Sequence, residues 1–326
     1  MPSRMNVEKN RVIGIDIGGT GTKIGIVDAR GKILARDESI STNAYPTFEE
    51  YINAINEVIG RLIRITDSEG KIRGIGVGAP DNNFYTGNIE HAFNLPWKGV
   101  LPLAKMLSER SGIPVRVTND ANAAAIGEMT YGTAKGMKNF IVITLGTGVG
   151  SGIVINGELV YGSDGFAGEL GHVTMVRGEE GRLCGCGRKG CLEAYCSATG
   201  VVRTAKEMLE TLDTPSLLRD IKAITSRDVY EAALKGDKIA LDVFEYTGKM
   251  LGEAIADFVA FSSPEAIILF GGLSRAGNLL LAPLQRSLDR SVLHTFKGKT
   301  KIIISQLPDS DAAILGASAL AWEQLP

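Results

Sequence analysis

One local pattern occurs twice in this chain, first from Asp16 and again from Thr144. In each copy an apolar run ends in a turn rich in glycine and threonine, and a second apolar run follows; the two segments read DIGGTGTKI and TLGTGVGSG. Internal repetition of this kind indicates that one structural unit has been duplicated. We therefore expect two lobes of similar build, each of which begins with an antiparallel meander.

The order of the expected elements supports the division into two lobes. Apolar and alternating runs predict strands over residues 12–17, 22–27, 32–40, 72–79 and 115–118. Helices are expected over 47–65, where Thr47 and Glu50 form a capping box, and over 101–110. The order then starts again, with strands over 140–145, 151–156, 158–161, 266–270 and 301–304 and helices over 198–212, 227–234, 240–261 and 312–322. We assign residues 1–120 and 312–326 to a smaller lobe and residues 121–311 to a larger one.

The size and charge of the chain narrow its function. At 326 residues it exceeds the length at which a single hydrophobic core stops growing, which agrees with two lobes. The net charge of −2 provides no basic field for nucleic acid or an anionic membrane. No apolar run reaches the length that a membrane helix requires, and the first ten residues lack the apolar segment of a signal peptide. We expect a cytoplasmic protein that binds neither nucleic acid nor membrane.

The first glycine-rich turn has the composition of an anion-binding loop. Glycine lets backbone N–H groups point at an anion, the threonines add hydroxyl donors, and Lys23 adds positive charge. A tight hairpin that needs glycine for its own geometry is the alternative, but such a hairpin would not require Asp16 at the end of a buried strand. We predict that the turn binds phosphate or Mg²⁺ through Asp16, Gly18, Gly19, Thr20, Thr22 and Lys23.

Two further glycine clusters follow apolar runs. The second copy of the turn would grip the same polyphosphate from the other lobe through Gly146, Thr147, Gly148 and Gly150. Gly271 and Gly272 join a buried strand to a helix. Glycine at that point either lets a nucleoside pack against the backbone or serves an ordinary strand-to-helix turn.

Thr118, Asn119 and Asp120 lie where a strand ends and a helix begins. Asn and Asp are favoured at helix N-termini for local reasons, so helix capping alone would explain them. The functional alternative is that Asp120 is a general base, because such an Asp accepts the substrate hydroxyl proton in phosphoryl transfer. The neighbouring Asn119 would then orient the substrate.

The most specific pattern is a set of one histidine and three cysteines. His172 is followed by Cys184, Cys186 and Cys191, and a Cys₃His set suits tetrahedral zinc. A disulfide is a poor alternative, because Cys184 and Cys186 are too close for a relaxed bridge and a third cysteine stays unpaired. Four protein ligands leave no open position, so we predict a structural zinc site.

Together these motifs resemble the ROK family (repressors, open reading frames and sugar kinases), and within it the bacterial glucokinase type. The resemblance runs from Asp16 to about Gly316 and is most specific in the Gly-Glu-Leu-Gly-His segment that ends at His172 and in Cys-Gly-Cys-Gly-x-x-Gly-Cys-x-Glu, which ends at Glu193. It implies the α/β fold of the actin-like ATPases, with two RNase H-like lobes around a central cleft and a C-terminal helix that returns to the first lobe.

The resemblance also implies the reaction and its ligands. The chain would transfer the γ-phosphoryl group of Mg²⁺-bound ATP to the 6-hydroxyl of glucose, with Asp120 as the base, a structural Zn²⁺ and a homodimeric assembly. Sugar hydroxyls would be bound by Asn94, Asn119, Asp120, Glu169, His172 and Glu193. One ring nitrogen of His172 would bind zinc and the other a sugar hydroxyl. Many relatives have glycine where this chain has Asp81, which leaves the preferred hexose open.

Other functions share parts of this pattern. Kinases for N-acetylmannosamine, N-acetylglucosamine, mannose or fructose would carry the same motifs. A non-catalytic sugar sensor or a transcriptional repressor is the alternative from another class. We do not expect a repressor, because only about ten residues precede the first expected strand and repressors of this fold carry a helix-turn-helix segment there.

Overall fold

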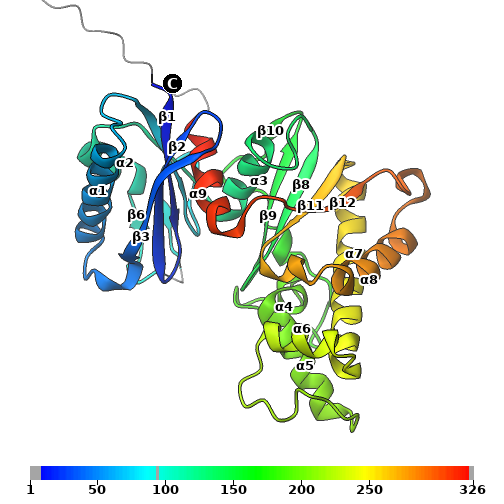
Figure 1. The fold of residues 1–326 in the computed structure, drawn as a ribbon. Helices are drawn as coiled ribbons and strands as arrows, with labels where there is room; N and C mark the ends of the chain where they lie inside the picture. Colours follow the sequence, from blue (N-terminus) through cyan, green and yellow to red (C-terminus); the bar gives the residue numbers. More distant parts are fainter. Residues whose placement is uncertain (1–8, 93–94, 323–326) are drawn as a thin grey trace, which may run out of the picture. The chain divides into compact units, whose positions relative to one another are not determined.

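The computed structural model describes residues 9–92 and 95–322 and divides the chain into two compact units (Figure 1). The first unit combines the residues up to 136 with residues 159–167 and those from 306 onward, and the second combines residues 137–158 with 168–305. Along the described part of the chain, the model has no helix with the length and apolar character of a membrane span.

The first unit is built on a five-stranded sheet with the order β3-β2-β1-β4-β7. These strands are β1 (Arg11–Ile17), β2 (Gly21–Asp28), β3 (Ile33–Ser41), β4 (Ile72–Gly78) and β7 (Val115–Thr118). The first three strands form the expected antiparallel meander, and β4 and β7 run parallel to β1. The short strands β5 (Ile89–Glu90) and β6 (Val100–Leu101) pair with each other beside this sheet.

Helices cover the two faces of this sheet (Figure 1). On one face lie α1 (Phe48–Ile65) and α2 (Leu103–Ser111), and on the other lie α3 (Asp120–Thr130) and α9 (Asp309–Leu320). The start of α1 confirms the expected capping box, since the Thr47 side chain accepts from the Glu50 N–H at 3.2 Å and the Glu50 carboxylate from the Thr47 N–H at 3.2 Å. The inward face of α1 carries Tyr51, Ile52, Ile55, Ile59 and Leu62, which recur at helical spacing and are buried.

Helix α9 lies so close to the sheet that only glycine fits beneath it. A Cβ atom on Gly14 would lie 2.1 Å from the carbonyl oxygen of Ile314, and one on Gly76 would lie 1.9 Å from that of Ala317. Helices α3 and α9 meet as closely, because a Cβ on Gly127 would lie 2.8 Å from the Cα of Gly316. This glycine contact places α3 in the first unit, whereas the boundary expected at residue 120 separated it from the preceding strands.

The second unit repeats the sheet of the first. Its strand order is β10-β9-β8-β11-β12, again a meander followed by two strands parallel to its first member. These strands are β8 (Phe140–Leu145), β9 (Val149–Ile155), β10 (Glu158–Leu159), β11 (Ala266–Phe270) and β12 (Lys301–Ile304). The shared order agrees with the duplication inferred from Asp16 and Thr144. Strand β9 begins two residues earlier than expected, because Val149 already pairs with Leu145 across a three-residue turn.

The helices of the second unit are α4 (Glu193–Cys196), α5 (Ala198–Thr211), α6 (Ser226–Leu234), α7 (Lys238–Ser262) and α8 (Asn278–Ser291). The expected bounds of α5, α6 and α7 agree with these within two residues. Helices α7 and α8 pack side by side (Figure 1), with Gly248 and Gly252 of α7 against the backbone of α8. Short 3₁₀ helices cover Leu170–His172 and Gly272–Ala276.

Candidate active site and metal centre

Asp16 lies near the carboxyl end of β1, on the sheet face that α3 and α9 cover. In the sheet it lies opposite Lys23 of β2 on one side and opposite Gly78 of β4 on the other. A Cβ on Gly78 would lie 3.8 Å from the Cα of Asp120, so the carboxyl ends of these strands bring Asp16, Lys23 and Asp120 together. The pKa of Asp16 is raised to about 6, first by burial and next by the negative charge of Asp120, while Lys23 opposes the rise. A buried carboxylate beside a second acidic group suits a divalent cation.

Asp120 is the first residue of α3, and Asn119 is its N-cap. The Asn119 side chain accepts from the Asn122 N–H at 2.7 Å, so the local capping explanation holds for Asn119. This bond uses the amide oxygen and leaves the Asn119 NH₂ group as a donor. Asp120 accepts from the Ala121 N–H at 2.8 Å, and burial nevertheless raises its pKa. The residue as a whole is exposed, while the burial that raises the pKa reflects reduced hydration of its carboxyl group.

Hydrogen bonds within the first unit stabilise the first glycine turn. Gly18 donates to the Gly21 carbonyl at 3.0 Å, and the Thr42 hydroxyl donates to the Gly18 carbonyl at 2.8 Å. In the part of the chain that the structure describes, neither Gly19 nor Thr20 donates its backbone N–H to another residue. Two unpaired N–H groups in one turn have the character of an anion-binding nest.

The expectation for Thr22 is wrong. Its side chain is 1% exposed, and its hydroxyl lies 2.5 Å from the Tyr51 hydroxyl and 3.3 Å from that of Thr42. The cause is the alternation of a strand, which puts Thr22 on the same face as Ile24 and Ile26, against α1. Thr22 therefore belongs to the core, whereas Thr20 is exposed.

The second glycine turn is braced by the start of α5. The Ala198 N–H donates to the Gly146 carbonyl at 2.9 Å, and the Thr199 hydroxyl to the Thr147 carbonyl at 3.0 Å. A Cβ on Gly146 would meet no described residue within 4 Å, so packing among the described residues does not explain a glycine there. Gly150 donates to the Thr144 hydroxyl at 3.1 Å, which orders the first residues of β9.

The two glycines of the third cluster, Gly271 and Gly272, differ in whether the fold requires them. Gly271 has a φ of +99°, and a Cβ there would lie 2.7 Å from the Leu145 carbonyl oxygen, so the strand-to-helix turn itself requires glycine. Among the residues that the structure places, a Cβ on Gly272 would meet nothing within 4 Å. Of this pair, Gly272 is the one that the fold leaves unexplained.

The four expected zinc ligands come together in the second unit. The candidate ligand atoms of His172, Cys184, Cys186 and Cys191 all lie within 4.8 Å of one another. The Cys186 and Cys191 sulfur atoms are 3.7 Å apart, and the Cys184 sulfur is 3.7 Å from His172 Nδ1. A tetrahedral ion with Zn–S bonds of about 2.3 Å requires ligands separated by nearly this distance, which is far too long for a disulfide. The set therefore fits one tetrahedral zinc ion, and Cys196 lies elsewhere, buried against the Thr247 carbonyl.

The zinc cluster adjoins two of the expected sugar ligands. With His172 Nδ1 turned toward Cys184, His172 Nε2 lies 3.9 Å from the Glu169 carboxylate. Glu193 follows the last cysteine ligand by two residues; its Oε1 lies 3.3 Å from Cys184 Sγ, and its Oε2 accepts from the Val149 N–H at 3.0 Å. One carboxylate thus joins the metal cluster to the second glycine turn. Asn94 lies outside the described residues.

Three buried polar residues near the start of α3, Asn82, Thr118 and Asn122, were given no binding role from the sequence. Asn82 is 3% exposed, and within the described residues both of its amide atoms lack a partner. The Thr118 hydroxyl and the Asn122 amide oxygen are also buried and have no hydrogen-bond partner among these residues. These residues follow or end β4 and β7, whose carboxyl ends are adjacent. Buried polar groups are nearly always paired, so these groups suit ordered water or a ligand.

The chain is similar over 96–97% of its length to proteins named glucokinase. It is 38% identical to a glucokinase of Halalkalibacterium halodurans, over 96% of this chain and 95% of that protein. It is 34% identical to a glucokinase of Thermotoga maritima, over 97% and 99% of the two chains.

The solved structures agree. A ROK family glucokinase from Streptomyces griseus, in complex with glucose and AMPPNP, is 35% identical, with a TM-score of 0.78 over 96% of this chain and all of that one. The two sheets of equal strand order make this the actin-like ATPase fold. Residues 12–324 match the model of the ROK family, and the chain is a member of that family.

Proposed function

We propose that this protein transfers the γ-phosphoryl group of ATP to the 6-hydroxyl of glucose. Support comes from relatives named glucokinase at 34% and 38% identity and from the Streptomyces griseus neighbour, whose structure contains glucose and an ATP analogue. The observation that carries the proposal is Asp120, an exposed residue whose carboxyl group has a raised pKa and lies beside Asp16. A general base in phosphoryl transfer requires this combination of access and reduced hydration.

Each group has a role in this proposal. Asp120 takes the proton of the sugar hydroxyl, and the NH₂ group of Asn119 holds a neighbouring hydroxyl. Glu169, His172 and Glu193 bind further sugar hydroxyls. Mg²⁺ bound near Asp16 would neutralise phosphate charge. The backbone N–H groups of the two glycine turns bind phosphate oxygens.

Zinc has a structural role in this scheme. With Nδ1 bound to the metal, His172 carries its proton on Nε2, which makes that nitrogen a donor to a sugar hydroxyl. Bound through His172, Cys184, Cys186 and Cys191, the ion would fix the loop that ends at Glu193. Cytoplasmic location, a homodimer and the absence of nucleic-acid binding remain predictions, and light scattering of the purified protein tests the dimer.

The experiment is a coupled ADP-release assay with Mg²⁺-bound ATP and five sugars: glucose, mannose, fructose, N-acetylglucosamine and N-acetylmannosamine. We expect kcat/KM for glucose to exceed the others by about tenfold, the discrimination that a few pocket contacts supply. Preference for an N-acetyl sugar would replace glucose as the substrate and leave the kinase assignment in place. Absence of turnover with all five sugars would refute the kinase proposal and favour a sugar sensor.

A further inference from the structure

Arg182 is a buried charge directly behind the metal cluster. It precedes Cys184 by two residues, and its side chain is 8% exposed. A guanidinium group removed from water is costly unless several partners surround it. Its surroundings therefore indicate what this residue holds in place.

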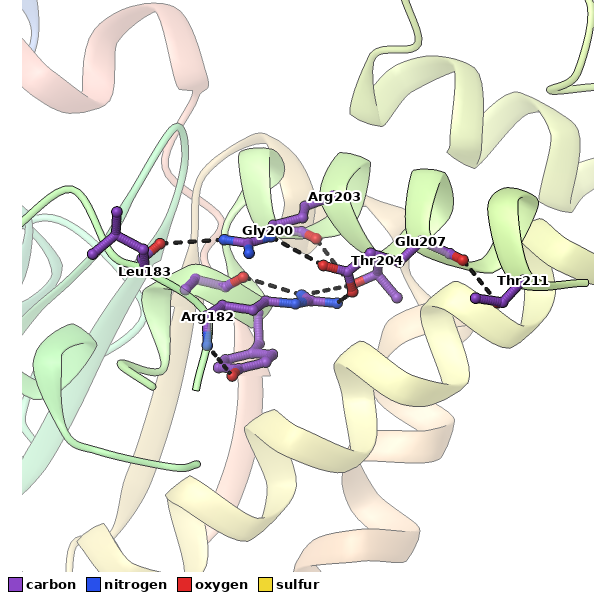
Figure 2. A network of polar contacts seen from close by, with 9 residues as sticks. Arg182, Leu183, Gly200, Arg203, Thr204, Glu207 and Thr211 are labelled. Carbon is purple, nitrogen blue, oxygen red and sulfur yellow. Dashed lines mark hydrogen bonds and ion pairs between the residues drawn. The ribbon is translucent and has the colours of Figure 1, made fainter. Parts of the chain in front are cut away.

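The partners of Arg182 come from three helices, α4, α5 and α7, and Figure 2 shows those on α5. Its guanidinium donates to the Thr204 hydroxyl at 2.9 Å and forms an ion pair with Glu207, both on α5. The same group stacks on the ring of Tyr195, with 4.6 Å between Cζ and the ring centroid, and lies 5.7 Å from the ring centroid of Tyr246. Planar stacking with several fixed hydrogen bonds is a geometry that arginine adopts and lysine cannot.

Two of its contacts go to the residues directly after Glu193. The guanidinium donates to the Ala194 carbonyl at 3.1 Å, and the Arg182 backbone N–H donates to the Tyr195 hydroxyl at 2.9 Å. In a longer helix the Ala194 carbonyl would accept from the Ala198 N–H, but that group donates to Gly146 instead. Arg182 therefore supplies the donor that the short helix α4 lacks.

Helix α4 cannot hold its own orientation. It has four residues, and a single turn of helix is unstable without outside contacts. Two features hold Glu193 in place. The cysteine ligands precede it directly in the chain, and Arg182 forms hydrogen bonds with Ala194 and Tyr195, which follow it. The direction of the Glu193 side chain toward the Val149 N–H depends on both supports.

We infer that Arg182 is a positioning residue for the Glu193 carboxylate, and so for the sugar that Glu193 binds. The inference rests on the proposed function, because it assigns Glu193 to the sugar. It predicts that disturbing Arg182 weakens sugar recognition while the metal and the nucleotide stay bound.

The chain offers a matched control. Arg203 also donates to Glu207, at 3.0 Å, and its guanidinium reaches the Leu183 carbonyl at 3.2 Å, but its side chain is 45% exposed (Figure 2). An exposed ion pair of this kind contributes little to stability. Arg182→Lys and Arg203→Lys therefore make the same chemical change at one buried and one exposed partner of Glu207.

The test compares both variants with wild type in steady-state kinetics, zinc content and calorimetric glucose binding. For Arg182→Lys we expect the glucose KM to rise about tenfold, with the ATP KM and one zinc per chain retained, because a small displacement of a binding carboxylate has large effects. Arg203→Lys should match wild type. An unchanged glucose KM in Arg182→Lys overturns the inference. An equal rise of both KM values, or loss of zinc, also overturns it, because Arg182 would then only stabilise the fold.

A milder variant keeps the test decisive if Arg182→Lys does not fold. Tyr195→Phe removes only the hydroxyl that accepts from the Arg182 N–H, and it should raise the glucose KM without loss of zinc; an unchanged KM overturns the inference. Wild-type turnover in the same assay tests the proposed function separately. If wild type binds glucose without phosphorylating it, the kinase proposal fails, and the calorimetric affinities of the variants still decide the role of Arg182.

Discussion

Gly148 is the position in the second glycine turn where a side chain would strike a proposed sugar ligand. A Cβ there would lie 2.3 Å from Glu193 Oε2 and 3.3 Å from its Cδ. Non-bonded heavy atoms need roughly 3.5 Å, so in Gly148→Ala the carboxylate must move by about 1 Å. That movement takes Oε2 away from the Val149 N–H, which it now meets at 3.0 Å.

Gly148→Ala should have a small effect on stability and a larger effect on activity. Glu193 Oε2 is the free end of a side chain, so the folding cost is limited to about the 1.5–3 kcal/mol of one hydrogen bond to a charged group. A displacement of about 1 Å at a substrate contact can lower kcat/KM by as much as 10²-fold. We therefore expect Gly148→Ala to fold, and to lose 10- to 100-fold in kcat/KM for glucose on the same reasoning.

The assay is a double-mutant cycle with Glu193→Ala, scored as kcat/KM for glucose. If Gly148→Ala acts through Glu193, it should cause little further loss once Glu193 is absent. Additive losses would refute the reasoning. Gly146→Ala is the matched control, because a Cβ there would meet nothing within 4 Å in the described part of the chain. It should leave the glucose KM unchanged and raise the KM for ATP if phosphate lies against that turn.

Three further predictions concern the base, the pH dependence and the metal. Asp120→Asn should lower kcat by about 10²–10⁴-fold while calorimetric glucose affinity is retained, and a near-normal kcat would exclude it as the base. Because the pKa of Asp16 is raised from 3.8 to about 6, its carboxylate forms as the pH rises through 6, and kcat/KM for ATP should rise over the same range. Lys23→Met removes a positive charge that lowers the pKa of Asp16, so the rise of kcat/KM for ATP should move to higher pH. An unchanged pH profile would contradict the assignment of this rise to Asp16. Because the folded state favours protonated Asp16, ionisation of this residue destabilises the fold. Its contribution to the free energy of unfolding therefore decreases as the pH rises from about 4 to about 6. Cys186→Ser should lose zinc, measured by elemental analysis, together with glucose affinity, and full metal content with normal affinity would exclude this ligand set.

Features that depend on local sequence could be predicted. The runs at β8, β11 and β12 are almost continuously apolar, and their bounds match the expectation. The four residues of the candidate metal cluster could also be identified from the sequence, because three of them lie within eight residues and their types are specific. Thr22 was misassigned, although the alternation with Ile24 and Ile26 already placed it on the core face.

Features that depend on distant contacts could not be predicted. Nothing near Gly127 in the sequence indicates that Gly316 will pack against it. Arg182 stands in a polar loop where a solvated charge is the ordinary expectation, and its burial depends on α5 and on Tyr246. The unpaired amide of Asn82 is likewise a property of the assembled fold, because a buried asparagine usually finds a partner nearby.

The close packing of α9 on the first sheet constrains the order in which the chain matures during synthesis. The sheet precedes the second unit in the chain, but the helix that seals its face over Gly14 and Gly76 follows the second unit and is therefore translated after it. The second unit is encoded between them and can fold while the N-terminal sheet still lacks this cover. A nascent chain therefore carries an open apolar face until the second unit and α9 have been translated, and a truncation before Ile314 would leave that face open.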